Sequence, residues 1–348
     1  MVQQAGLVAL FGSGETSASG RRVYEWVFSR LAPPLKVAIL ETPAGFQPNS
    51  AAVAHKIGDF LAERLQNHHP RVDVVPARRR DGPFSTDDHD LLRPMLSSKV
   101  LFMGPGSPTY AVRHLRGSLA WEYLRARHRL GSALLLASAA TIAVGAHTLP
   151  VYEIYKVGEE PHWQRGLDLF GPYGLCLTFV PHWDNAEGGA ELDTSRCFMG
   201  EARFRRLLEL LPPGTTIVGI DEHTALVADP AVGVCQVMGR GGVTLLRDGV
   251  ESRFRSGQSF PMERLGPFRV PSAKEGISPE AWERALAAGE GEPQMAIDPP
   301  SELVAMVQRR EAARRQRDWA IADALRAEIA ELGWRVTDTP EGPLLEPS

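Results

Sequence analysis

Ser138 lies at the point where a buried strand is predicted to pass directly into a helix. It falls within ALLLASAATIAVGAH (133–147), where an apolar run gives way to small residues and a helical pattern. A nucleophile elbow has this layout, because a sharp strand-to-helix turn exposes a hydroxyl at the sheet edge. Leu136 and Ala140, however, occupy the glycine positions of the usual Gly-x-Ser-x-Gly pattern. Spacing alone favours the alternative that Ser138 is a helix N-cap, so both interpretations stay open.

A histidine and several acids follow other predicted strands. His182 comes after the apolar run of GLCLTFVPHWD (174–184), where it is a candidate general base. Glu222, beside Asp221 in GIDEHTALV (219–227), could orient the imidazole. Glu153, in PVYEIYK (150–156), competes for that third role. The alternatives are a hydrogen-bonded loop histidine and acids that cap turns.

Backbone amides near the serine could stabilise an oxyanion. Gly104 and Gly106 lie between a predicted strand and a predicted helix, and glycine allows the backbone to approach a substrate closely. Ala139 would supply a second amide from the start of its helix. An ordinary strand-to-helix turn needs glycine equally. No metal-binding spacing such as HExxH is present, so we expect no metal ion and no other cofactor.

Short apolar runs predict the strands that must position these residues. They alternate with helix-length amphipathic segments, which predicts an α/β fold with a mostly parallel sheet flanked by helices. Ligands of such sheets bind at the carboxyl ends of the strands, so the residues after each run are the candidates. The runs are 6–12, 36–41, 72–76, 99–104 and 133–138.

The pattern changes twice along the chain. After about residue 174, short strands separated by Gly and Asp turns predict a β-rich end to the same domain. From 299, two short helices broken near Gln316–Asp318 precede a hairpin with a turn at Pro340–Gly342. The predicted organisation is an α/β domain over 1–255, a linker over 256–298 and a small helical module over 299–348. The Arg-rich run 77–81 is expected to be a solvated loop.

Bulk properties exclude several classes of protein. The 348 residues are 43% hydrophobic and 23% charged, which suits a sizeable core and argues against general disorder. A net charge of -4 does not suit a general nucleic-acid binder. The three cysteines lack CxxC spacing and are expected to be reduced thiols. No signal peptide or membrane-length apolar segment is visible, so we expect a cytoplasmic protein with no membrane partner.

Taken in this order, the segments around Ser138 resemble the aspartyl dipeptidase and cyanophycinase family of serine peptidases over about residues 6–250. LASAATIAVG aligns with the family's GxSAGAxxLG, and PHWD with its PHF-like strand end. GIDEHTALV matches GIDExTALV and is the most specific of these segments. GPGSPTYAVRHL resembles the family's GGNxxxLxxxL segment, which contributes backbone to the oxyanion hole; it is the least specific.

This resemblance implies a class I glutamine-amidotransferase-like, flavodoxin-like sheet and hydrolysis of peptide bonds that involve acidic residues. It makes Ser138 the nucleophile, His182 the base and Glu222 the acid that holds the imidazole. Arg196 lies on the matching segment after the histidine, where it could pair with a substrate carboxylate or form a structural ion pair. The elbow without its glycines departs from the family pattern.

The tail carries a second resemblance, to the C-terminal end of cysteinyl-tRNA synthetases. The match is most specific in DWAIADALR and DTPEGP. The HIGH and KMSKS signatures are absent, and no cysteine-binding zinc set is visible, so the chain is not expected to be a synthetase. Tail arginines could contact tRNA phosphates, but acids interleave with them and a solvated face is the alternative. These arginines are Arg309, Arg310, Arg314, Arg315 and Arg317.

Two functions follow as hypotheses. The first is a serine hydrolase that acts on a small peptide or amide, in which the serine, the histidine and an acid converge beside an open cavity. The second is a non-catalytic binding protein that keeps the fold and docks on tRNA or a translation factor through its tail. The second predicts a filled or distorted elbow.

Overall fold

The computed structural model describes residues 4–289, 301–316, 318–332, 334–339 and 342–347. The chain divides into two compact units, Met1–Gly289 and Glu290–Ser348. We call them unit 1 and unit 2 and describe each by itself.

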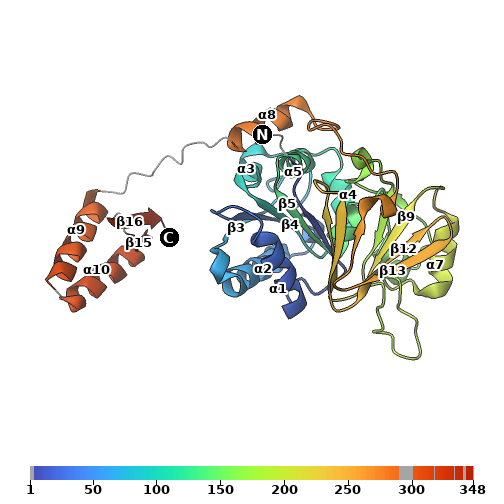
Figure 1. Ribbon diagram of the computed structural model, residues 1–348, viewed down its shortest axis with the longest axis horizontal. Coiled ribbons are helices and arrows are strands. Elements are labelled where there is room, and N and C mark those ends of the chain that lie inside the picture. The colour runs from blue at the N-terminus through green and yellow to red at the C-terminus, as the bar shows by residue number, and fades with distance from the viewer. Residues whose placement is uncertain (1–3, 290–300, 317, 333, 340–341, 348) are drawn as a thin grey trace. The chain divides into compact units, whose positions relative to one another are not determined.

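An eight-stranded mixed sheet forms the centre of unit 1 (Figure 1), in the order β14-β11-β10-β1-β5-β4-β2-β3. The five neighbouring strands β1, β5, β4, β2 and β3 run parallel to one another. On the other side of β1, each of β10, β11 and β14 pairs antiparallel with the strand before it in the sheet. The predicted α/β class, with its mostly parallel sheet, is confirmed. The bounds are β1 (Val8–Phe11), β2 (Lys36–Leu40), β3 (Arg71–Val75), β4 (Val100–Met103), β5 (Ala133–Ala137), β10 (Thr224–Asp229), β11 (Val234–Gly239) and β14 (Ser259–Pro261).

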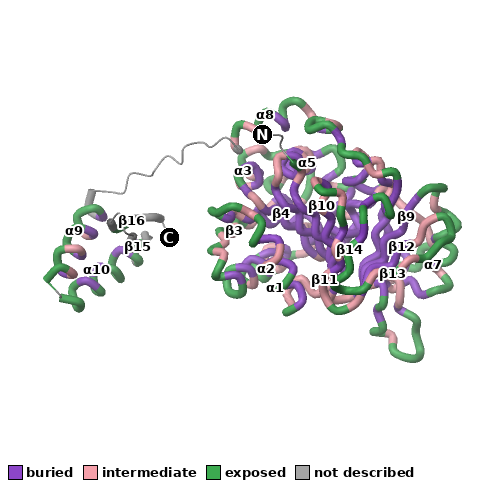
Figure 2. The backbone as a smooth tube through the Cα atoms, viewed as in Figure 1, coloured by how far each residue is buried: buried purple, intermediate pink, exposed green. Residues whose placement is uncertain are grey.

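Helices cover both faces of this sheet, which explains why its strands are apolar throughout. Successive residues of β5 point to opposite faces. Leu134 and Leu136 pack into one cluster with α3, α4, α5 and α8, whereas Leu135 and Ala137 pack into another with α1 and α2. Figure 2 shows the buried strands at the centre of the unit. The helices are α1 (Ala18–Phe28), α2 (Ser50–Arg64), α3 (His89–Ser97), α4 (Pro108–Leu115), α5 (Leu119–Arg129) and α8 (Pro279–Gly289).

The predicted β-rich segment contributes to two sheets. Four of its strands form a separate four-stranded sheet in the order β13-β12-β9-β8, and β10, β11 and β14 join the large sheet. The second sheet packs with α7 (Gly200–Glu209) around Phe204 and Trp183. Its strands are β8 (Leu177–Val180), β9 (Thr216–Ile220), β12 (Gly242–Arg247) and β13 (Val250–Arg255). The segment of the chain between β5 and β8 contains α6 (Ala139–Ala143), β6 (His147–Thr148), a π-helical turn (Glu153–Val157) and β7 (Gln164–Arg165).

The linker predicted over 256–298 does not begin at residue 256. Residues 256–289 contain β14, a short 3-10 turn and α8, and they belong to unit 1. Ala281, Trp282 and Ala285 of α8 are buried in the core cluster that also contains α3 and α5. The many Gly, Pro and Glu residues of this segment made the short apolar face of α8 hard to recognise from the sequence. Residues 290–298 lie outside the described residues.

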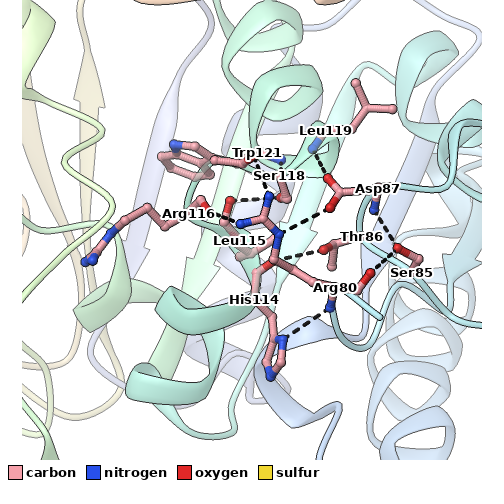
Figure 3. Close-up of polar contacts among 11 residues, drawn as sticks. Arg80, Ser85, Thr86, Asp87, His114, Leu115, Arg116, Ser118, Leu119 and Trp121 are labelled. Carbon is pink, nitrogen blue, oxygen red and sulfur yellow. Dashed lines mark hydrogen bonds and ion pairs between the residues drawn. The ribbon is translucent and has the colours of Figure 1, made fainter. Parts of the chain in front are cut away.

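The Arg-rich run after β3 is a loop with Arg79, Arg80 and Asp81 exposed, as predicted, and Arg80 also anchors it to the chain (Figure 3). Arg80 donates from Nη1 to the Arg116 carbonyl over 3.2 Å and from Nη2 to the Gly117 carbonyl over 3.0 Å. Asp87 accepts the Leu119 N–H at the start of α5 over 2.8 Å. The loop after β3 is therefore held against the junction of α4 and α5.

Unit 2 contains the two predicted helices and the predicted hairpin strands. Asp318 caps the second helix by accepting the Ile321 N–H over 3.2 Å. A small core joins the elements through Leu303, Val307, Ile329 and Val336. The predicted turn at Pro340–Gly342 includes two positions, 340 and 341, outside the described residues. The elements are α9 (Ser301–Arg315), α10 (Trp319–Glu331), β15 (Trp334–Thr339) and β16 (Gly342–Pro347). Among the described residues of both units, no helix has the length and apolarity needed to cross a membrane.

Candidate active site

Ser138 forms a strained turn between β5 and α6. Its φ is 51° and its ψ is -108°. A non-glycine residue held in such a sparsely populated region costs about 1–3 kcal/mol, and such residues gather at functional sites. Ser138 stands at the N-cap position of α6, but its side chain makes no capping hydrogen bond. Instead, its Oγ lies 3.0 Å from Nε2 of His182. The Ser138 side chain therefore faces the histidine and does not cap the helix.

The turn forms without the usual glycines because the replacing side chains point into the core. Leu136 and Ala140 are fully buried and pack in one apolar cluster. The Thr141 hydroxyl lies 2.8 Å from the Leu136 carbonyl and 3.0 Å from the Phe11 carbonyl. The backbone N–H of Ser138 donates to the same Phe11 carbonyl over 3.3 Å. Thr141 thus ties the elbow to β1 and β5.

His182 reaches the serine from the end of β8. Its backbone has a φ of 50°, and its N–H donates to the Gly12 carbonyl over 3.3 Å. Its Nδ1 lies 3.0 Å from Oε1 of Glu222, which follows β9. The Phe198 ring lies beside the imidazole, with 5.9 Å between centroids. The structure therefore brings Ser138, His182 and Glu222 into one hydrogen-bonded series.

The environment of Glu222 keeps its carboxylate ionised. The hydrogen bond from His182, joined by one from Asn185 Nδ2 over 2.9 Å, holds the pKa of Glu222 at about 2 despite partial burial. An ionised carboxylate only accepts hydrogen bonds, so Nδ1 of His182 must carry a proton. In the neutral imidazole Nε2 is then free to accept the Ser138 proton. Sequence reasoning missed Asn185, which is buried three residues after His182.

A cavity of about 350 Å³ opens beside the serine. Gly106 and Ala139 line it, and within the part of the chain that the structure describes neither amide N–H donates to another group. Gly106 has a φ of 153°, and a Cβ there would lie 2.0 Å from the Pro43 carbonyl oxygen. The position therefore requires glycine. The remaining lining residues are Pro108, Ser138, Ile142, Val151, Tyr152, Tyr155, Lys156, His182, Glu187, Cys197 and Phe198.

The competing acids lie in other interactions. Glu153 Oε1 accepts the Thr109 hydroxyl over 2.6 Å, and the structure shows no bond from Glu153 to the imidazole among the described residues. Asp221 accepts the Gly242 N–H over 2.7 Å and pairs with Arg253. Of the three acids considered from the sequence, Glu222 contacts His182.

Arg196 does not line the cavity. Its guanidinium lies 4.0 Å from the centre of the Trp183 ring and donates from Nη1 to the Trp183 carbonyl over 3.3 Å. Its Nη2 is 3.8 Å from Glu201. Arg196 thus lies in an ion-pair and stacking arrangement outside the cavity lining, and a contact of Arg196 with substrate stays a prediction.

Other chemistry finds little support at this site. Cys197 lines the cavity, but burial and then Glu222 raise the pKa of its thiol to about 12, which makes it a poor nucleophile. In the ranges that the structure covers, no group of three or more His, Cys, Asp or Glu residues could hold a metal ion.

Comparison with known proteins shows what the C-terminal residues are similar to. Residues 298–342 match the family model of the cysteinyl-tRNA ligase anticodon binding domain. The cysteine–tRNA ligase of Rubrobacter xylanophilus is 36% identical over 99 residues, which are 28% of this chain and 19% of that ligase. The ligase of Methanosarcina mazei is 47% identical over 49 residues, 14% of this chain and 10% of the ligase. The chain thus spans less than a fifth of the length of these relatives.

Unit 1 has a solved structural counterpart. A peptidase from an acI-B1 Actinobacterium superposes with a TM-score of 0.60 and 19% identity, over 75% of this chain and 98% of that chain. At this identity the likeness shows a shared fold. The chain therefore combines a sheet with the fold of a peptidase and a C-terminal domain of the cysteinyl-tRNA ligase anticodon-binding type.

Proposed function

We propose that unit 1 is a serine hydrolase that cleaves a small peptide or amide, with Ser138 as nucleophile, His182 as general base and Glu222 as the acid that orients the imidazole. One observation carries the proposal: the hydrogen-bonded series Ser138–His182–Glu222 begins at a strained turn and faces a cavity. A structural serine would have no need of the strained φ of 51°.

The reaction proceeds by acyl transfer. Ser138 Oγ attacks the substrate carbonyl carbon while His182 Nε2 takes its proton. The amides of Gly106 and Ala139 stabilise the resulting oxyanion. The imidazolium then protonates the leaving amine, and the C–N bond breaks to leave an acyl ester on Ser138. Water, deprotonated by His182, hydrolyses this ester, releases the carboxylic acid and restores the serine.

The ionised Glu222 stabilises the imidazolium that forms in both half-reactions. Its pKa of about 2 keeps it charged at any physiological pH. Asn185 donates to the same carboxylate oxygen and so fixes the position of that oxygen beside His182 Nδ1.

The substrate is a short peptide containing an acidic residue, in keeping with the resemblance to dipeptidases and cyanophycinases. Lys156 is exposed and lines the cavity, so its ammonium group is the cation available to a substrate carboxylate there. Arg196, by contrast, stacks on Trp183 outside the lining. A Lys156→Gln change should raise KM for acidic dipeptides and leave neutral dipeptides unaffected.

A fluorophosphonate probe tests the nucleophile directly. The full chain should be labelled at Ser138, as located by peptide mass spectrometry, and Ser138→Ala should not be labelled. Equal labelling of the two proteins would contradict the hydrolase. A series of dipeptides assayed for released amine then identifies the preferred substrate.

A second proposal concerns unit 2, whose matched family is named for anticodon binding. We infer that this unit contacts tRNA and that the protein acts in the cytoplasm, where tRNA is used. Retention of bulk tRNA on a filter should depend on residues 299–348 and should weaken with salt, since phosphate contacts release counterions. Retention unchanged after their deletion would refute the proposal. Ser138→Ala should retain tRNA normally, because the serine lies in unit 1.

A further inference from the structure

A second cavity, of about 510 Å³, lies at the other end of β5 from the serine. Arg129, the last residue of α5, lines it and precedes β5, whereas Ser138 follows β5. Tyr173 and Pro271 also line it, and no residue lines both cavities. Ligand pockets typically measure about 300–1,000 Å³, so this one could hold a small organic molecule.

Arg129 is a buried cation that forms no ion pair among the described residues. Its relative exposure is 6%. Its guanidinium lies 4.6 Å from the centre of the Tyr173 ring, and its Nη1 donates to the Ser272 carbonyl over 3.3 Å. Among the described residues it forms no ion pair with a carboxylate. A buried charge usually has a charged or metal partner, so this environment favours an anion supplied from outside the chain.

The neighbouring acids are already engaged by other arginines. Glu122 pairs with Arg125. Glu275 accepts two bonds from Arg269, one of them 3.0 Å long. Three arginines therefore share two carboxylates, and among the described residues Arg129 is the one of the three that forms no ion pair with either, although Glu275 acts on it through space. Burial lowers the pKa of Arg129 from its ordinary value, and Tyr173 and Glu275 only partly oppose that shift.

The rest of the cavity is lined largely by apolar residues, and Tyr173 is fixed by its neighbours. The Tyr173 hydroxyl lies 2.7 Å from His128 Nε2, and its ring stacks on Phe268 with an interplanar angle of 5°. Val270, Pro271 and Pro230 add apolar wall. Tyr173 is thus held in place independently of any ligand, and its ring fixes the guanidinium that lies over it.

We propose that this cavity binds a small carboxylate with a flat apolar body, its carboxylate paired with Arg129 and its body packed along the Val270–Pro271 wall. A guanidinium presents two parallel N–H donors, which match the two oxygens of a carboxylate. A single cation within an apolar lining suits a monocarboxylate better than a multiply charged phosphate.

The test uses ¹⁹F NMR of 4-fluorobenzoate with the full chain, and 4-fluorobenzamide as the neutral counterpart. The benzoate signal should broaden and shift on addition of protein, and the benzamide signal should not. Arg129→Met should weaken benzoate binding at least tenfold. Val270→Glu should do the same without disturbing the fold, because this wall residue is 65% exposed and its new carboxylate competes for Arg129.

Two control variants place the binding at this cavity rather than elsewhere on the chain. Val250→Glu changes an equally exposed valine, 65%, on β13 and should bind benzoate as wild type does. Lys156→Gln removes the lysine that lines the first cavity and should also leave binding unchanged. Equal binding of benzoate and benzamide would overturn the proposal. So would wild-type binding by Val270→Glu, or binding lost only in Lys156→Gln.

Discussion

Replacing Glu222 by glutamine tests the electrostatic part of the proposed mechanism. The change keeps the shape of the side chain and removes its charge. In the wild-type protein, Oε1 of Glu222 accepts hydrogen bonds from His182 Nδ1 over 3.0 Å and from Asn185 Nδ2 over 2.9 Å. Both bonds end on the same oxygen, and a glutamine that turned its NH₂ group there would face the NH₂ group of Asn185, so the glutamine keeps its oxygen in place and Nδ1 keeps its proton. The change therefore removes the negative charge that stabilises the imidazolium and leaves the tautomer of His182 unchanged.

The size of the loss follows from the charge that the change removes. The pKa of Glu222 falls from 4.5 to about 2, which corresponds to at most about 3 kcal/mol at 1.36 kcal/mol per unit. Because the side chain is partly exposed, solvent screening reduces this to roughly 1–2 kcal/mol, or about 5- to 30-fold in rate. We therefore expect labelling to slow by about 5- to 30-fold.

The assay is the second-order rate of fluorophosphonate labelling at neutral pH. Glu191→Gln is the matched control, because Glu191 is an exposed glutamate on the loop that follows His182. The control should label at the wild-type rate, and Ser138→Ala should not label. Labelling of Glu222→Gln within twofold of wild type would refute the role of the carboxylate, provided that thermal unfolding shows both variants folded.

Four further predictions follow from the same geometry. Ser138→Gly should be more stable than Ser138→Ala by about 1 kcal/mol in urea unfolding, because glycine adopts a positive φ freely; equal stability would argue against strain. Gly106→Ala should lower the free energy of unfolding by about 1–3 kcal/mol and slow labelling, since its Cβ meets a carbonyl oxygen at 2.0 Å. The folded pKa of Glu222 lies below its unfolded value, so its stabilisation is complete above pH 4.5 and is lost as the pH falls toward about 2; the wild-type urea midpoint should fall more steeply across that window than that of Glu222→Gln. Thr141→Val should slow labelling at least about tenfold through displacement of the elbow, and Thr141→Ser should restore it.

Much of unit 1 could be predicted because its strands are buried on both faces. Runs such as 133–138 are apolar without interruption, and strict alternation with helical segments limits the topology to a mostly parallel sheet. The second sheet was less accessible. Nothing local distinguishes β9, which pairs with β8 and β12, from β10, which pairs with β1 in the large sheet. Partner choice depends on packing across the whole domain rather than on strand composition.

The site was predictable to the extent that its residues follow strands. Ser138 follows β5 directly, and His182 and Glu222 lie two residues after the ends of β8 and β9; the carboxyl ends of strands are where ligands bind in such folds. Asn185 gave no such signal, because a loop asparagine is common and its bond to Glu222 depends on how the loop folds back. Strand spacing alone left Glu153 and Asp221 open beside Glu222, and only the resemblance of GIDEHTALV favoured Glu222.

The elbow shows how a departure from a motif can be absorbed. Glycine is needed where a Cβ would collide or where φ is positive. At Ser138 the positive φ falls on the serine itself, and the flanking Leu136 and Ala140 direct their side chains into the core cluster. Packing of those two side chains, with the Thr141 hydroxyl against two carbonyls, supplies interactions that glycines could not. The missing glycines therefore do not argue against a nucleophile here, because the strain that matters stands at 138.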